Sequence, residues 1–335
     1  MPPALIERAA LAFLVSAGVC LALGPSTIKW LTAQKFRQPF RHEDCPPLKP
    51  LHEQKQGTPT MGGLFVLAAA LAAALLCGAW IGREGALMLL AVVGLGLLGG
   101  IDDWQKFRLP NAAGLPKRLK LLVALALGAA VGVCTANPLW GYRELVVPWM
   151  SRRIDAGMWW VPLSMGVVAG SAHAVNLTDG MDGLAAGLLV VAFAALGVLA
   201  GVETQAGAIT PMVMMWCACF AGACAAFLWF NSHPAAVFMG DVGALGLGAG
   251  LGTAALLSHQ ALGLLLIGGV FVAEAGSVML QVASYKWRNK RRIFRVAPLH
   301  HHVELGGVGE QTVVARFWVV GLLLAAAAVH AMTRS

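Results

Sequence analysis

Residues 176–201 read NLTDGMDGLAAGLLVVAFAALGVLAG, a short polar stretch followed by eighteen residues without a charge. A helix of about 20 apolar residues crosses a hydrocarbon core about 30 Å thick, so the second part of this stretch resembles a membrane span. Similar runs recur at 9–28, 62–81, 86–101, 119–136, 158–175, 207–230, 242–258, 261–284 and 313–332. We therefore predict an all-α, polytopic integral membrane protein with about ten transmembrane helices.

The overall composition agrees with this interpretation. The 335-residue chain is 58% hydrophobic and 12% charged, whereas ordinary soluble domains are roughly 45–50% apolar and about 25% charged. The first apolar run has no basic stretch before it and no small-residue cleavage site, so we expect a retained helix and not a signal peptide. The seven cysteines show no CxxC spacing, which favours packed thiols over disulfides or a zinc site.

Lysine and arginine are unevenly distributed among the connections. Residues 29–61, 102–120 and 285–312 carry six, five and six of the 24 basic residues, while the alternate connections and the termini share six. The positive-inside rule places the first set in the cytoplasm and both termini outside. The net charge of +8 therefore reflects membrane topology, and we expect no nucleic-acid partner.

Polar motifs gather on the cytoplasmic side of a single predicted transmembrane domain, residues 1–335. They lie in the connections at about 29–61, 102–118, 176–183, 231–241 and 285–312. The first connection ends in Lys55 and the sequence GTPTMGG at 57–63. The backbone amides of such a turn can hold phosphate oxygens, and an ordinary loop entering a helix is the alternative.

Carboxylates mark the connections that follow. Asp102 and Asp103 come directly after an apolar run, where two adjacent acids oppose the helix dipole; they indicate a site more than a solvated helix end. Asp241 begins a later apolar run, where a helix cap is a good explanation. The basic side chains at 117–120, taken singly, are expected to be membrane-interface anchors.

Three further features carry polar groups. The stretch Asn176–Gly183 holds two carboxylates, and a tight polar turn explains only one of them. Glu274 lies within an apolar run, where an ionisable residue is a functional candidate by default, although pairing with Ser277 or another helix also explains it. The three successive histidines at 300–302 cannot all face one point on a helix, and we favour contact with phosphate over a zinc site.

The inventory as a whole indicates a reaction class. Carboxylates from three connections offer the oxygen ligands that Mg²⁺ prefers, while lysines, imidazoles and the 57–63 turn suit anionic oxygens. This combination is typical of phosphoryl transfer, which depends on positioning, metal neutralisation and electrostatic stabilisation. A cytoplasmic-side active site at the membrane surface indicates that one reactant is carried by a lipid.

Five motifs resemble, in order and spacing, those of the phospho-N-acetylmuramoyl-pentapeptide transferase family of the polyprenyl-phosphate sugar-1-phosphate transferase superfamily. They are Lys55 with GTPTMGG at 57–63, the Asp102-Asp103 pair, NLTDGMDG at 176–183, FMGDVG at 238–243 and APLHHHVE at 297–304. The resemblance covers nearly the whole chain. Two segments depart from the family pattern: Ala113-Gly114-Leu115 stands where Lys-Gly-Leu is usual, and Gly306-Gly307-Val308-Gly309 where Lys-Gly-Trp-Pro is usual.

The resemblance implies an enzyme of peptidoglycan synthesis in the bacterial inner (cytoplasmic) membrane. It implies transfer of phospho-MurNAc-pentapeptide from UDP-MurNAc-pentapeptide to undecaprenyl phosphate, giving lipid I and UMP, with Mg²⁺ as cofactor. The implied site residues are Asp102, Asp103, Asp241 and His301 as catalytic groups; Lys55, Thr60, Lys106, Asn176, Asp179, Asp182, Asn231, Phe238, Gly240, His300 and His302 as substrate contacts; and Asp241, with Asp179 as a second candidate, as metal ligands. Direct attack by the lipid phosphate and a two-step route through a carboxylate both stay open.

Two alternatives also stay open. The nearer is a related polyprenyl-phosphate N-acetylhexosamine-1-phosphate transferase, although the GTPTMGG and APLHHH motifs favour the muramoyl enzyme. The more distant is a membrane transporter that uses Glu274 as its coupling group. The transporter hypothesis predicts polar groups that can be reached from both sides of the membrane, whereas the motifs gather on one side. The sequence does not decide whether the protein forms a homodimer.

Overall fold

The computed structural model describes residues 2–34, 36, 57–108, 114–150, 152–207 and 209–333. Within these ranges the chain is mostly helical. The helices are α1 (Pro3–Ala33), α3 (Gly63–Leu76), α4 (Gly82–Arg108), α5 (Lys117–Thr135), α6 (Trp160–Thr178), α7 (Leu184–Gln205), α8 (Met212–Asn231), α9 (Gly240–Leu257), α10 (Leu264–Ile267), α11 (Gly269–Trp287), α12 (Leu299–Glu304) and α13 (Glu310–Thr333). The prediction of an all-α, polytopic membrane protein is confirmed.

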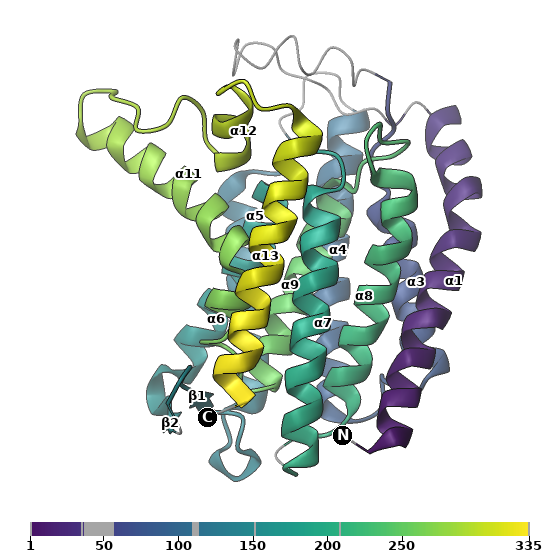
Figure 1. The fold of residues 1–335 in the computed structure, drawn as a ribbon, viewed down its shortest axis with the longest axis vertical. Coiled ribbons are helices and arrows are strands. Elements are labelled where there is room, and N and C mark those ends of the chain that lie inside the picture. The colour runs from purple at the N-terminus through teal and green to yellow at the C-terminus, as the bar shows by residue number, and fades with distance from the viewer. Residues whose placement is uncertain are drawn as a thin grey trace.

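The long helices run side by side as a bundle (Figure 1), and α9 lies in its interior. Every residue of α9 from Val242 to Leu257 is buried, and α3, α4 and α6 pack around it. Its many glycines allow this, because small residues let helix backbones approach closely in lipid. A Cβ on Gly63 of α3, for example, would overlap the backbone of Gly243 in α9. The first turn of α9 is therefore held firmly between neighbouring helices.

Seven of the described helices are long and apolar enough to cross a membrane. They are α1, α4, α5, α7, α8, α9 and α13. Helices α3, α6 and α11 lie in three of the other predicted apolar runs, but α3 has only 14 residues. The number of ten spans therefore stays a prediction.

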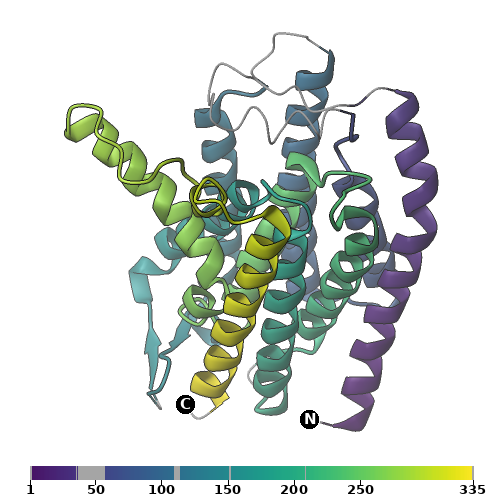
Figure 2. The same ribbon diagram turned by 45° about the horizontal axis from the view of Figure 1, so that its top comes forward.

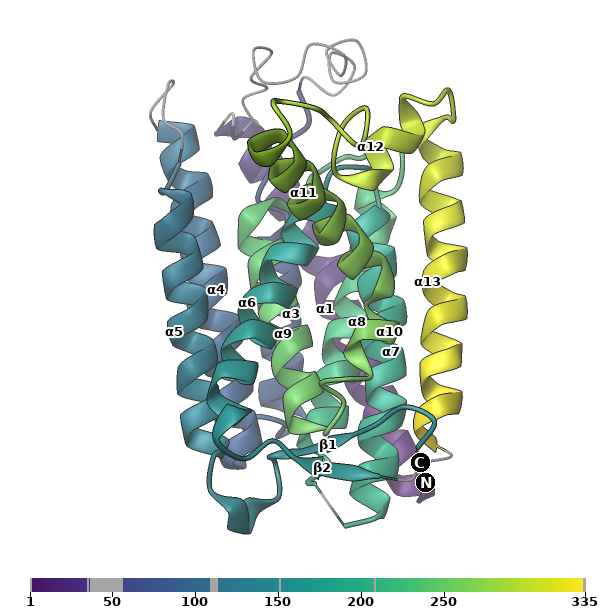
Figure 3. The same ribbon diagram turned by 90° about the vertical axis from the view of Figure 1, so that its left-hand side faces the viewer.

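The run expected as one span at 261–284 is divided in the structure. Helix α10 ends at Ile267, and α11 begins at Gly269 after the intervening Gly268. Two consecutive glycines lower helix propensity and permit this break. Beyond the break, α11 leans out from the bundle at the end that also carries α12, as Figures 1 and 3 show.

The two ends of the bundle differ. At the end where both termini lie, the chain adds a small hairpin (Figure 3), which the predicted all-α fold did not include. Its elements are η2 (Pro138–Trp140), β1 (Glu144–Val146), β2 (Arg153–Asp155) and η3 (Gly157–Trp159). The strands pair antiparallel, with Leu145 opposite Ile154, and Arg153 reaches Glu203 of α7 at 2.9 Å. The other end, turned forward in Figure 2, carries α12 and the described parts of the connections with the polar motifs.

Candidate active site

Three carboxylates meet at the end of the bundle opposite the hairpin. Asp102 and Asp103 lie near the end of α4, and Asp241 lies in the first turn of α9. The two helices touch here, because a Cβ on Gly99 of α4 would overlap the backbone of Asp241. One oxygen from each carboxylate lies within 4.8 Å of the others. The structure thus brings together the three aspartates that the sequence indicated.

Two lysines contact this carboxylate cluster. Lys106 Nζ lies 2.6 Å from Asp102 Oδ2 and 3.2 Å from Asp241 Oδ2. Lys120 Nζ lies 3.2 Å and 3.0 Å from the same two oxygens. Because Asp102 is fully buried, its charge depends on such partners. The expectation of an interface anchor is therefore wrong for Lys120: the start of α5 turns this side chain toward the cluster.

Hydrogen bonds fix the orientation of each carboxylate. Asp102 Oδ1 accepts from the backbone N–H of Leu115 at 2.6 Å, and Asp103 Oδ2 accepts from the backbone N–H of Val242 at 3.1 Å. Asp241 Oδ2 accepts from Lys106 Nζ and Lys120 Nζ at 3.2 Å and 3.0 Å, and the side chain of Asn176 lies close enough to interact with this carboxylate, which places that predicted residue at the cluster. Charges held in this way need little reorganisation during a reaction.

Gly240 borders the same cluster. Its φ of +75° lies in the left-handed region, which glycine adopts at little cost. A Cβ at this position would lie 2.7 Å from Asp103 Oδ2 and 3.0 Å from Thr60 Oγ1. Gly240 and Thr60, both predicted as substrate contacts, therefore lie beside Asp103, and a side chain at 240 would fill this space.

The GTPTMGG segment runs alongside the segment that leads into α9. Phe238 donates its backbone N–H to the carbonyl of Pro59, and Gly62 donates its N–H to the carbonyl of Phe238, both at 2.8 Å. The first and fourth of the predicted polar connections are therefore joined by backbone hydrogen bonds. This pairing fixes Thr60 with respect to α9.

A cavity of about 620 Å³ opens on the same end of the bundle. It is lined by Thr58, Gly180, Met181, Asp182, His233, Pro234, Ala235, Phe238, His301, Glu304 and residues 307–312. Phe238 lines the cavity while Asp241, three residues later, belongs to the carboxylate cluster. Three residues of extended chain span at most about 11 Å. The cavity and the cluster are thus close enough for one substrate to reach both.

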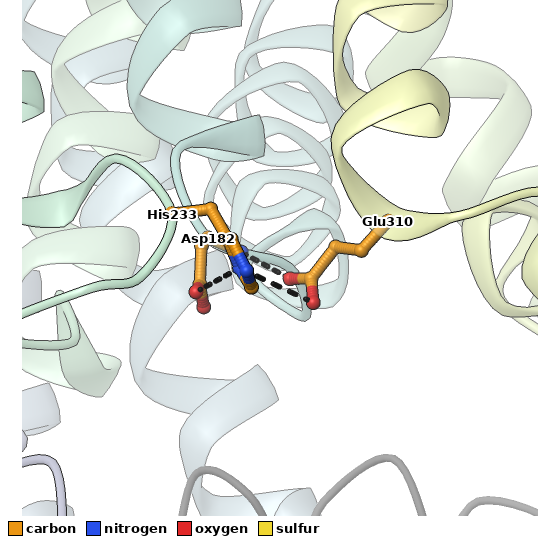
Figure 4. A group of neighbouring side chains, drawn as sticks. All are labelled: Asp182, His233 and Glu310. Carbon is orange, nitrogen blue, oxygen red and sulfur yellow. Dashed lines mark hydrogen bonds and ion pairs between the residues drawn. The ribbon is translucent and has the colours of Figure 1, made fainter.

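Figure 4 shows a second polar group, in which Asp182, His233 and Glu310 point toward one another. His233 Nδ1 lies 3.0 Å from Asp182 Oδ2 and 3.8 Å from Glu310 Oε2. Glu310 also accepts the backbone N–H of Asp182 at 2.9 Å. The sequence indicated Asp182 but neither partner, because the three residues belong to separate connections and no local pattern joins them.

The three histidines face different surroundings. His301 lines the cavity, and its Nδ1 lies 3.0 Å from Glu304 Oε2. Burial lowers the pKa of His301 below its ordinary value of 6.5, and Glu304 partly offsets this effect. His300 is buried against Glu274 of α11, and His302 Nδ1 instead accepts the backbone N–H of Arg295 at 3.1 Å. Of the three, His301 alone lines the cavity within the described part of the chain.

Three other predicted residues lie apart from the cluster or cannot be placed. Asn231 is buried; its Oδ1 accepts from Gly183 N–H at 3.0 Å and its Nδ2 donates to the Val237 carbonyl at 2.9 Å, so it holds two segments together. Asp179 follows the last residue of α6, and its roles stay predictions. Lys55 lies outside the described residues.

The carboxylate cluster fits a divalent cation of the Mg²⁺ class. Its candidate ligands are all carboxylate oxygens, which Mg²⁺ prefers, whereas the group in Figure 4 includes an imidazole that suits transition metals. Asp241 has the most exposed side chain of the three aspartates, at 17%. The two lysine ammonium groups show that this position already stabilises positive charge.

Comparison with known proteins gives a consistent result. Residues 86–259 match the model of glycosyl transferase family 4, and residues 55–67 match phospho-N-acetylmuramoyl-pentapeptide-transferase signature 1. A phospho-N-acetylmuramoyl-pentapeptide-transferase of Thermodesulfovibrio yellowstonii is 41% identical over 95% of this chain and 91% of its own length. Proteins with the same name from Solidesulfovibrio magneticus and Citrifermentans bemidjiense are each 40% identical, over 95% and 98% of this chain and 90% and 91% of their lengths.

Proposed function

Because the chain belongs to the phospho-N-acetylmuramoyl-pentapeptide-transferase family, we propose that it transfers phospho-MurNAc-pentapeptide from UDP-MurNAc-pentapeptide to undecaprenyl phosphate. A phosphate oxygen of the lipid bonds to the sugar-linked phosphorus as the bond to the UMP oxygen breaks, directly or after transfer through a carboxylate. The products are lipid I and UMP. The observation that carries the proposal is the carboxylate cluster with its two lysines at the end of transmembrane helices.

The lysines are the protein groups that meet the transferred phosphate. Lys106 and Lys120 each bridge Asp102 and Asp241, so their ammonium groups are already held in place when an anionic substrate enters. Asp102 accepts from both lysines and from a backbone N–H, which suits a residue that positions charge. Asp241 and Asp103 would hold Mg²⁺, which when bound neutralises phosphate charge and polarises the phosphoryl group.

The cavity is the proposed site of the nucleotide part of the donor. Phe238 offers an aromatic surface for the base, while Asp182 and His301 provide polar groups on the same cavity wall. Since Phe238 and Asp241 are three residues apart, a base beside Phe238 leaves the diphosphate near the carboxylate cluster. The lipid phosphate then approaches from the membrane side.

We also propose that the enzyme lies in the bacterial inner membrane with this site in the cytoplasm and both termini outside. The support is twofold. The helix ends that flank the connections predicted to be cytoplasmic lie at the end of the bundle that holds the cluster, and the two termini lie at the other end (Figure 1). The donor is a nucleotide-linked sugar, and metabolites of this class are found in the cytoplasm, which is the side proposed for the site.

The test measures Mg²⁺-dependent UMP release from added UDP-MurNAc-pentapeptide in sealed membrane vesicles. Inverted vesicles should be active and right-side-out vesicles inactive. Asp241→Asn should lower release at least about 100-fold, whereas Asp155→Asn should retain it, because Asp155 is exposed on the hairpin at the opposite end. Full activity of Asp241→Asn would contradict the proposed site, and a preference for UDP-GlcNAc would favour the related hexosamine transferase.

A further inference from the structure

Glu274 is a buried carboxylate that the proposed reaction does not use. It is the sixth residue of α11, and its side chain is 0% exposed. Burying a charged carboxylate costs several kcal/mol unless a partner compensates it, so its contacts decide its role. Within the described part of the chain, its carboxylate oxygens contact one residue, His300.

This contact has two components. Glu274 Oε1 accepts the backbone N–H of His300 at 3.1 Å, and Oε2 lies 3.2 Å from the imidazole Nδ1. Helix α12 begins after Pro298, which provides no side-chain cap, so Glu274 satisfies one of the free N–H groups of its first turn. The second carboxylate oxygen lies beside one edge of the buried ring, so the carboxylate borders both the backbone and the side chain of His300.

The opposite edge of the ring touches the turn between α6 and α7. A Cβ on Gly180 would overlap His300 Nε2, so the ring lies directly against the backbone there. Among the described residues neither ring nitrogen of His300 has a hydrogen-bond partner, although the side chain is only 1% exposed, so the ring is held by close contacts. Gly180 lines the cavity, as does His301, the next residue of α12. The His300 ring is therefore clamped between α11 and the cavity wall.

We propose that Glu274 is a positioning residue for the transfer reaction. It holds the His300 ring against Gly180 and so fixes α12, which carries His301 into the cavity. The inference rests on the proposed function, because it requires the cavity to bind the phosphorylated donor. Displacing a reacting group by about 1 Å can cost about 100-fold in rate, so loss of this anchor should reduce turnover more than donor binding.

The first test compares Glu274→Ala, His300→Ala and the double variant in UMP release. Each single substitution should lower kcat about 10- to 100-fold, with KM for UDP-MurNAc-pentapeptide changed less than about threefold. The double variant should lose less than the two single losses combined, because the ring contact is shared by both residues while the bond from Glu274 to the backbone N–H of residue 300 persists in His300→Ala. Additive losses would overturn the proposal. Ser277→Ala is the control, since among the described residues the hydroxyl of this buried serine of α11 donates to the backbone carbonyl of Glu274 and not to its carboxylate, so the variant should keep the parent kcat.

Two further variants distinguish positioning from general damage to the fold. Glu274→Gln keeps an acceptor for the His300 N–H, so its kcat should be at least about tenfold higher than that of Glu274→Ala. Equal kcat values for the two variants would overturn the proposal. Gly180→Ala should lower kcat in the parent, where the methyl group displaces His300, but not in His300→Ala, where the space is free. An equal loss in both backgrounds would rule out the clamp.

These outcomes are separate from the test of the proposed function. If the parent protein releases no UMP, the proposed function itself fails. If the parent is active and Asp241→Asn is inactive, but Glu274 and His300 give additive losses, the function stands and the positioning role is rejected. Thermal unfolding of each purified variant identifies any that has lost its fold.

Discussion

Replacing Lys120 with methionine tests the electrostatic balance of the carboxylate cluster. Its ammonium group lies 3.2 Å from Asp102 Oδ2 and 3.0 Å from Asp241 Oδ2. At an effective dielectric constant of about 20, each contact contributes about 5 kcal/mol of Coulomb energy. The desolvation of the lysine offsets much of this sum, and breaking a buried ion pair typically costs about 3–5 kcal/mol. We therefore expect Lys120→Met to destabilise the protein by about 3 kcal/mol without divalent cations.

The same substitution should change the response to Mg²⁺. Two ammonium groups lie beside the three carboxylates, and Lys120→Met removes one of them, so the local charge becomes one unit more negative. The more negative cluster attracts a divalent cation more strongly. Mg²⁺ should therefore raise the unfolding temperature of the variant by more than it raises that of the parent.

The assay follows tryptophan fluorescence during thermal unfolding in detergent, with EDTA and then with millimolar Mg²⁺. Lys117→Met is the matched control, because Lys117 is exposed at the start of the same helix and should change the unfolding temperature little in either condition. Equal unfolding temperatures of Lys120→Met and the parent in EDTA would refute the ion-pair argument. An equal rise of both with Mg²⁺ would refute the assignment of the cluster as the cation site.

Two further predictions concern the packing of α9 and the cavity. Gly63→Ala should prevent α3 from packing correctly against α9, because its methyl group would overlap the backbone of Gly243. Gly276→Ala is the control, since the space around its Cβ is open. The yield of monodisperse protein should be lower for Gly63→Ala, and equal yields would contradict this prediction. Burial lowers the pKa of His301 below 6.5. As the pH falls, this imidazole is therefore protonated in the unfolded chain before it is protonated in the folded protein, and the free energy of unfolding should decrease below about pH 6.5. This loss should be smaller in His301→Gln, as measured by unfolding temperature between pH 7.5 and 5.5.

Hydropathy predicted most of the fold because the bilayer imposes a local requirement. Each span must be apolar along about 20 consecutive residues, which can be read without knowing how helices pack. The break at Gly268 was not predicted, because the residues around it are as apolar as those of a continuous helix. The hairpin was also missed, because its strands are three residues each and its interfacial aromatic residues dominate the pattern.

The site could be predicted only where its residues carry a local signal. Asp102, Asp103 and Asp241 stand out because carboxylates beside apolar runs are costly. Lys120 does not, since a lysine at a helix end is usually an interface anchor and only the approach of α4 and α9 reveals its partners. His233 and Glu310 were missed for a related reason: they meet Asp182 across separations of 51 and 128 residues.

The position of α11 also bears on the transporter alternative. That hypothesis requires Glu274 to titrate in a pathway through the membrane, where ions reach it from either side. In the structure the carboxylate is fully buried, accepts the His300 N–H and lies beside the His300 imidazole, and α11 leans out at the end of the bundle that carries α12 (Figure 3). A coupling carboxylate must exchange its partner during each cycle, whereas this one supports a fixed segment of the cavity wall. This buried acid is therefore better explained by the geometry of the transferase site than by transport.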